Sequence, residues 1–152
     1  MTVLIVEDDE NKRLQLRQFL GELLPSAEFV MKRSLQSSVR SIRESVPELI
    51  ILDMTLPNYD TTPEEPGGQM YKTGGREFLR QMDRFEINTP VIVVTQFEKF
   101  GETHDSMDLP ALDSLLRREH SDVYKGFVYY NAAISDWKQE LEALVRSVLS
   151  LS

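Results

Sequence analysis

Residues 47–57 read Pro47-Glu48-Leu49-Ile50-Ile51-Leu52-Asp53-Met54-Thr55-Leu56-Pro57. Four consecutive apolar residues run directly into an aspartate, and a proline stands on either side of them. The run is too short for a helix and too apolar for a strand with one face in water. It therefore predicts a central strand of a parallel sheet. Ligands of open α/β sheets bind beyond the carboxyl ends of such strands, so Asp53 is expected to be a ligand, a nucleophile or a helix cap.

A second apolar run, Val3 to Val6, is followed at once by the acidic stretch Glu7 to Glu10. Three further segments are expected to form strands: 28–31, 90–95 and 126–130. Apolar residues at helical spacing follow each strand, so strands and helices alternate along the chain. This alternation predicts an α/β fold: a flavodoxin-like, doubly wound three-layer sandwich around a five-stranded parallel sheet of order 2-1-3-4-5. The site of this fold lies between the first and third strands, which end in Glu7-Asp8 and in Asp53.

The composition is that of a soluble globular protein. The 152 residues are 41% hydrophobic and 28% charged, with a formal net charge of -8. The negative charge argues against direct nucleic-acid binding, which normally uses a basic face. There is no cysteine, which excludes disulfides, thiolate metal sites and cysteine nucleophiles. No apolar run approaches a membrane span and no signal peptide is recognised, so we expect a cytoplasmic protein without membrane contact.

We expect one domain over residues 1–152, without an output domain. Two long segments have loop composition, because polar residues, and in the first also prolines and glycines, replace the apolar pattern: about 58–74 and 96–108. Both segments follow strands whose ends are expected to form the site, so we expect them to lie on its rim.

Three expected strand ends bring oxygen-bearing side chains together. The first supplies Glu7, Asp8 and Asp9, the third supplies Asp53, and the fourth supplies Thr95. Carboxylates so close together repel one another unless a cation lies among them. Oxygen ligands without His or Cys favour Mg²⁺ or Mn²⁺. A carboxylate beside such an ion can attack phosphorus, and a hydroxyl opposite can hydrogen-bond the new phosphoryl group.

Each of these residues also has a purely structural interpretation. Asp8 or Asp9 can cap the first helix, Asp53 can brace the loop after it, and Thr95 is an ordinary strand residue. Capping and bracing do not explain why the acidic residues meet at neighbouring strand ends.

The chain resembles the receiver domain of two-component response regulators over nearly its whole length. The similar motifs, in chain order, are Leu4-Ile5-Val6-Glu7-Asp8-Asp9, Leu52-Asp53-Met54-Thr55-Leu56-Pro57, Gly75-Arg76-Glu77-Phe78-Leu79 and Pro90-Val91-Ile92-Val93-Val94-Thr95. The resemblance implies that Asp53 is the phosphoacceptor and that Asp8 binds Mg²⁺ or Mn²⁺ directly. It also implies that Glu7 acts through water and that the backbone carbonyl of Thr55 completes the protein ligands.

The resemblance also assigns the switch residues and reveals a departure. Thr95 matches the switch hydroxyl, and Phe127 matches the switch aromatic, although packing alone also explains a phenylalanine there. The family has a lysine at the end of the fifth strand that pairs with the phosphoryl group, but here Tyr130 stands in its place. Lys125 does not lie at that strand end, and Lys99 lies on a loop that borders the site. Because a tyrosine brings no charge, we expect phosphorylation to change the conformation only slightly.

The function implied by the resemblance is that of a stand-alone receiver in a phosphorelay, which is not an enzyme. Its partners would be a histidine kinase or phosphotransfer protein and a downstream protein target; whether it forms a homodimer is left open. One alternative is a receiver-like interaction module that works without phosphorylation, which Tyr130 favours. Another is a Mg²⁺-dependent phosphatase with Asp53 as nucleophile, which resembles the haloacid dehalogenase type. Thr55, however, stands where that family has a second aspartate.

Overall fold

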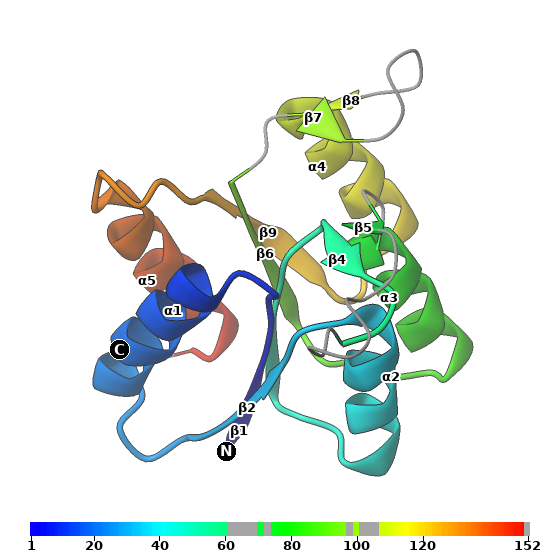
Figure 1. Cartoon of the computed structure of the whole chain (residues 1–152), viewed down its shortest axis with the longest axis horizontal. Coiled ribbons are helices and arrows are strands. Elements are labelled where there is room, and N and C mark those ends of the chain that lie inside the picture. Colours follow the sequence, from blue (N-terminus) through cyan, green and yellow to red (C-terminus); the bar gives the residue numbers. More distant parts are fainter. Residues whose placement is uncertain (61–69, 72–73, 97–98, 101–106, 151–152) are drawn as a thin grey trace.

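A five-stranded parallel sheet forms the centre of the molecule (Figure 1). The computed structural model describes residues 1–60, 70–71, 74–96, 99–100 and 107–150. The strands of this sheet are β1 (Thr2–Val6), β2 (Glu28–Lys32), β3 (Leu49–Leu52), β6 (Val91–Thr95) and β9 (Tyr124–Tyr129). Their order is β2-β1-β3-β6-β9, and all neighbours are parallel. The predicted flavodoxin-like topology is confirmed.

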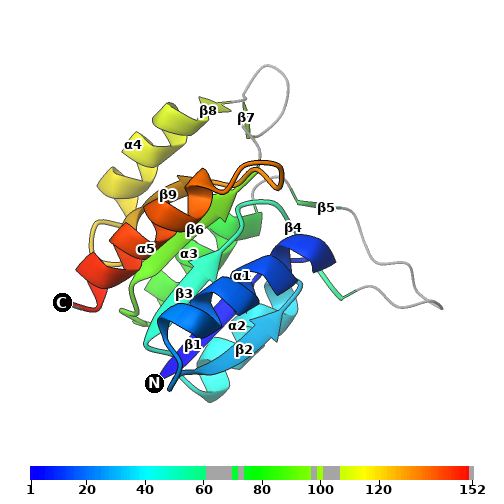
Figure 2. The ribbon, with the colours of Figure 1, turned by 90° about the vertical axis from the view of Figure 1, so that its left-hand side faces the viewer.

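Helices cover both faces of this sheet. The described helices are α1 (Glu10–Leu23), α2 (Leu35–Glu44), α3 (Gly74–Arg84), α4 (Leu109–Glu119) and α5 (Asp136–Val148). Figure 2 shows α1 and α5 side by side in front of the strands. Helices α2, α3 and α4 pack against the opposite face. This is the predicted three-layer sandwich.

The central strand β3 is buried on both faces, as its sequence predicts. Ile50 and Leu52 pack into the core that faces α2, α3 and α4, whereas Leu49 and Ile51 pack into the core that faces α1 and α5. All four side chains are at most 1% exposed. Because burial of such a side chain contributes about 1.5–3 kcal/mol, this strand anchors both cores and fixes the position of Asp53 behind it.

Helix boundaries follow from local hydrogen bonds. Asp9 caps α1, since its Oδ2 accepts the backbone N–H of Lys12 at 2.8 Å. The capping interpretation is therefore confirmed for Asp9. Val46 is 56% exposed because α2 already ends at Glu44.

Two short antiparallel strand pairs were not predicted. One joins β4 (Leu56–Pro57) to β5 (Met70–Tyr71), and the other joins β7 (Lys99–Phe100) to β8 (Met107–Asp108). They lie within or beside the segments expected to be loops, 58–74 and 96–108. Most of those two segments falls outside the described residues. Among the described helices, none has the length and apolar character needed to cross a membrane.

Candidate functional site

Three carboxylates meet at the carboxyl ends of β1 and β3. Glu7 and Asp8 follow β1, and Asp53 follows β3; one oxygen from each lies within 4.8 Å of the others. The parallel register pairs Val6 with Leu52, and the Asp53 N–H donates to the Val6 carbonyl at 3.0 Å. Glu7 and Asp53 are 2% and 3% exposed, whereas Asp8 is half-buried. The acidic cluster predicted from the sequence is therefore present in space, and we call these three residues the acidic cluster.

The start of α3 packs directly on the backbone that carries Asp53. The Gly75 N–H donates to the Met54 carbonyl at 2.9 Å. A Cβ at position 75 would lie 2.6 Å from the Met54 Cα and 2.8 Å from the Asp53 carbonyl oxygen, closer than real Cβ atoms come. Only glycine allows this approach, so Gly75 lets α3 hold the segment after β3 in place.

A lysine from α1 enters the acidic cluster, which the sequence analysis did not predict. Lys12 Nζ lies 2.6 Å from Glu7 Oε2 and 3.6 Å from Asp53 Oδ1. It also donates to the Val94 carbonyl on β6 at 2.8 Å, and the side chain is 0% exposed. The sequence did hold a signal for this position. Lys12 heads the buried face of α1, at helical spacing before Leu16 and Leu20.

Burial and mutual repulsion dominate the electrostatics of the cluster. The pKa of Glu7 is raised to about 8, first by desolvation and then by the Asp53 charge, against the lowering effect of the Lys12 ammonium. Desolvation also raises the pKa of Asp53, against the lowering effects of Lys12 and of the Thr55 backbone N–H. The pKa of the half-buried Asp8 is raised by desolvation and by the charge of Asp9. One ammonium therefore compensates only part of the negative charge gathered here.

The donor set fits a hard divalent cation. Glu7 Oε2 and Asp53 Oδ1 are both buried within the acidic cluster. The ammonium of Lys12 near both atoms is their charge partner. The other Glu7 oxygen, Oε1, accepts the Asp9 N–H at 3.0 Å, so both carboxylate oxygens of Glu7 already have a partner in the protein. Asp8 and Asp53 are thus better placed than Glu7 to bind Mg²⁺ directly.

The other predicted site residues lie at the ends of β6 and β9. Thr95 is buried and directly follows Val94, whose carbonyl accepts Lys12 Nζ. The Tyr130 N–H donates to the Thr95 carbonyl at 2.8 Å. The Tyr130 ring packs against Trp137, with 5.1 Å between ring centroids, and its centroid lies 5.7 Å from Lys12 Nζ. Tyr130 is therefore a core residue at the wall of the site.

Phe127 lies apart from the acidic cluster. It pairs with Val93 of β6, is half-buried, and packs against the core on the side of α2, α3 and α4. The side chain of Lys99, which borders the expected rim, falls outside the described part of the structure. Thr55 is buried beside Asp53.

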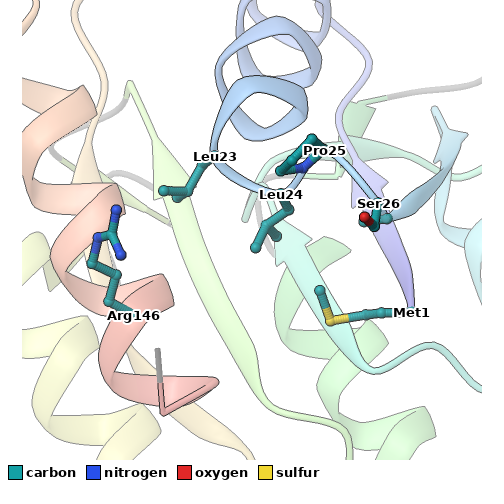
Figure 3. Close-up of a pocket in the computed structure, with 7 residues that line it drawn as sticks. Met1, Leu23, Leu24, Pro25, Ser26 and Arg146 are labelled. Carbon is teal, nitrogen blue, oxygen red and sulfur yellow. The ribbon is translucent and has the colours of Figure 1, made fainter. Parts of the chain in front are cut away.

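Depressions lie beyond both ends of the strands of the sheet. One, of about 400 Å³, lies between the ends of α1 and α5 near the amino end of β1 (Figure 3). No carboxylate lines it, so it does not offer the predicted chemistry. The other, of about 410 Å³, lies beyond the carboxyl ends of β6 and β9, and no residue of the acidic cluster lines it. Its lining residues are Asp9, Asn11, Gln96, Tyr129, Tyr130, Asn131 and Ala132.

Relatives of known sequence match nearly the whole chain, although no protein-family model does. Protein y4jR of Sinorhizobium fredii (strain NBRC 101917 / NGR234) is 39% identical over 145 residues, which cover 93% of this chain and 95% of the relative. The Detocs response regulatory protein DtcB of Enterobacter cloacae (strain JD6301) is 31% identical over 143 residues, with the same two coverages.

Solved structures of response regulators share the fold. The phosphorylated cyanobacterial phytochrome response regulator RcpA has a TM-score of 0.69 at 19% identity, covering 99% of this chain and 95% of its own. The Mn²⁺-bound response regulator Rcp1 has a TM-score of 0.66 at 17% identity, covering 95% and 91%. The structures show the fold and the DtcB match shows the family. The chain therefore belongs to the receiver-domain family of response regulators.

Proposed function

We propose that this chain is a cytoplasmic phosphorelay receiver that accepts a phosphoryl group on Asp53 and signals by protein–protein contact. One observation carries the proposal. The Asp53 carboxylate stands buried behind the central strand, within 4.8 Å of two further carboxylates, and its Oδ1 makes no hydrogen bond to the described residues. A carboxylate kept in such an environment is unfavourable for stability alone, which supports a functional role.

The proposed reaction is transfer from a phosphohistidine. A carboxylate oxygen of Asp53 attacks phosphorus, a P–O bond forms as the P–N bond breaks, and the imidazole nitrogen keeps the electron pair of the broken bond. The product is an aspartyl phosphate with no net change in oxidation.

Mg²⁺ or Mn²⁺ is the cofactor we propose. Asp8 and Asp53 would bind it directly, Glu7 through water, and the Thr55 carbonyl would complete the protein ligands. When bound, the ion neutralises the incoming phosphoryl oxygens. The Mn²⁺ in the structure of Rcp1 supports this assignment, as does the all-oxygen donor set of the acidic cluster.

The partners we propose are a histidine kinase or a phosphotransfer protein upstream and a protein target downstream. The response-regulator relatives favour this role over the phosphatase alternative. We propose no catalysis beyond removal of the chain's own phosphoryl group.

A phosphorylation-independent interaction module is the second candidate. The observation that favours it is the Lys12 ammonium, which compensates part of the charge of the acidic cluster without a metal or a phosphoryl group. Such a pocket can persist as a structural feature alone.

Intact mass after exposure to Mg²⁺ and acetyl phosphate separates the two candidates. The wild type should gain one phosphoryl group, and the gain should vanish with EDTA or in Asp53→Asn. Asp136→Asn, a change at an exposed aspartate at the start of α5, is the matched control and should label like the wild type. Absence of any gain in the wild type, under conditions that label other receivers, would favour the phosphorylation-independent module.

A further inference from the structure

The surroundings of Lys12 define a cation site built by the fold. Its ammonium is fully buried and touches three elements: Glu7 Oε2 after β1, Asp53 Oδ1 after β3 and the Val94 carbonyl on β6. Arg13 is another cation nearby, but its guanidinium donates to the backbone carbonyls of Glu7 and Asp8, at 3.2 and 3.5 Å. Among the described ion pairs, those that involve Asp53 are made by Lys12.

We propose that Lys12 supplies, from α1, the positive charge that holds the phosphoryl oxygens once Asp53 is phosphorylated. This inference rests on the proposed phosphorylation of Asp53. In this proposal a lysine of the first helix binds the phosphoryl oxygens. The end of the last strand has Tyr130 and therefore no cation for this role.

The distances explain why the contact should strengthen on phosphorylation. At 3.6 Å, the contact from Lys12 Nζ to Asp53 Oδ1 is an ion pair that is too long for a good hydrogen bond. A phosphoryl group on Asp53 carries more charge and places further oxygens near the ammonium. A charge-assisted hydrogen bond then becomes available that the carboxylate alone does not make. An interaction that is stronger in one state stabilises that state.

The walls around the ammonium suit this role. The Tyr130 ring centroid lies 5.7 Å from Lys12 Nζ, and Trp137 packs behind that ring. Aromatic surface there shields the ion pair from water without adding a competing charge. The contact with the Val94 carbonyl, next to Thr95, links the ammonium to the end of β6. A change in the contacts of Lys12 would therefore change the environment of the end of β6 as well as that of α1.

The wild-type protein tests the proposal directly by ¹⁵N NMR of lysine side chains. Beryllofluoride with Mg²⁺ serves as the phosphoryl mimic, and adduct formation is followed by ¹⁹F NMR. We expect the Lys12 Nζ signal to shift on adduct formation, while that of Lys125, exposed on β9, stays in place. An adduct that forms while the Lys12 Nζ signal stays unchanged would overturn the proposal.

Variants give a second test. Trp137 is the single tryptophan and packs on Tyr130, so its fluorescence can report beryllofluoride affinity at saturating Mg²⁺. Lys12→Met should weaken that affinity by roughly tenfold or more, as expected for one lost charge-assisted hydrogen bond. Lys125→Met removes the same charge from an exposed position and should bind like the wild type. Lys12→Met/Tyr130→Lys, which returns a cation from the strand, should recover much of the loss.

The outcomes separate this inference from the proposed function. Equal affinity in Lys12→Met and the wild type, with normal labelling of Asp53, overturns the role of Lys12 and leaves the phosphoreceiver standing. Wild type that forms no adduct and gains no phosphoryl mass overturns both. If Lys12→Met does not fold by circular dichroism, the double variant and the wild-type NMR experiment decide.

Discussion

The first turn of α1 and the residue that follows β9 both lie beside the acidic cluster, but one is charged and the other is aromatic. Helix α1 contributes the Lys12 ammonium, which contacts two of the three clustered carboxylates. Strand β9 leads into Tyr130, whose ring joins the core through Trp137. Charge therefore comes from the helix and packing from the strand end. The difference shows that the positive charge beside Asp53 is not tied to the end of the last strand, because a helix can place a lysine at the same site.

The largest expected effect comes from removing the charge on the α1 side. Lys12→Met keeps most of the aliphatic chain but leaves buried carboxylates uncompensated, so the metal-free protein should lose about 3–5 kcal/mol of unfolding free energy. Urea unfolding measures this, with Lys125→Met as the exposed control. Mg²⁺ should restore part of the loss, because it supplies the missing positive charge. A loss no greater than that of Lys125→Met would show that the ion pair does not stabilise the fold.

The second effect is a pH dependence of the metal-free stability. The folded pKa of Glu7 lies above its ordinary value, at about 8 against 4.5, chiefly because of burial. The folded state then binds more protons than the unfolded state between these values. The extra proton on Glu7 therefore stabilises the folded state fully below about pH 4.5, and this stabilisation is lost as the pH rises through about 8. The raised pKa values of Asp53 and Asp8 act in the same direction.

Thermal unfolding with EDTA or Mg²⁺ measures this dependence. Stability in EDTA should fall across that interval, and the gain from Mg²⁺ should grow with pH because the ion binds the ionised carboxylates. The fall should be steeper in Lys12→Met and unchanged in Tyr130→Leu. Metal-free stability that rises with pH across the interval would contradict the assignment.

Replacing the aromatic ring tests the packing side of the comparison. Tyr130→Leu keeps an apolar side chain but removes the contact with Trp137, so we expect a loss of roughly 1–2 kcal/mol. Mg²⁺ should not restore this loss, because no charge is removed. Recovery by Mg²⁺ equal to that of Lys12→Met would mean that Tyr130 contributes to the electrostatics of the pocket.

The sequence predicts the fold from features that are local and strong. The apolar run before Asp53 and the acidic turn after Val6 each mark a buried strand and its carboxyl end. The parallel order then brings Glu7, Asp8 and Asp53 together without further information. The short pairs β4–β5 and β7–β8 escape prediction, because two residues carry no periodicity.

The position of Lys12 in the acidic cluster was not predicted from the sequence for a different reason. Two of its three partners, Asp53 and Val94, lie far away along the chain, Val94 by 82 positions, and a lysine at the start of an amphipathic helix usually faces water. Only the packing of α1 against the sheet turns its side chain into the acidic cluster. The absence of a lysine at the end of β9 is correctly read from the sequence. The lysine that does reach the site, Lys12, lies on α1 and not on that strand.

The smallest expected effect on stability is that of Asp8→Asn, which removes charge without removing packing. Asp8 is half-buried, so water screens its repulsion with the cluster, and the metal-free protein should gain no more than about 1 kcal/mol. Mg²⁺ affinity should nevertheless fall by roughly tenfold or more, because a proposed direct ligand is lost. Calorimetric titration checks this, with Asp136→Asn as control; equal affinity in Asp8→Asn and wild type would remove Asp8 from the metal site.

Combining Asp8→Asn with Lys12→Met sharpens the comparison further. If both act through the same excess of negative charge, Asp8→Asn should stabilise the Lys12→Met protein more than it stabilises the wild type, because uncompensated repulsion is then greater. Such neighbouring sites are expected to be non-additive. Combined with Tyr130→Leu, whose effect is on packing, the same change should be additive. If Asp8→Asn were additive with Lys12→Met as well as with Tyr130→Leu, the charges of Lys12 and Asp8 would not interact.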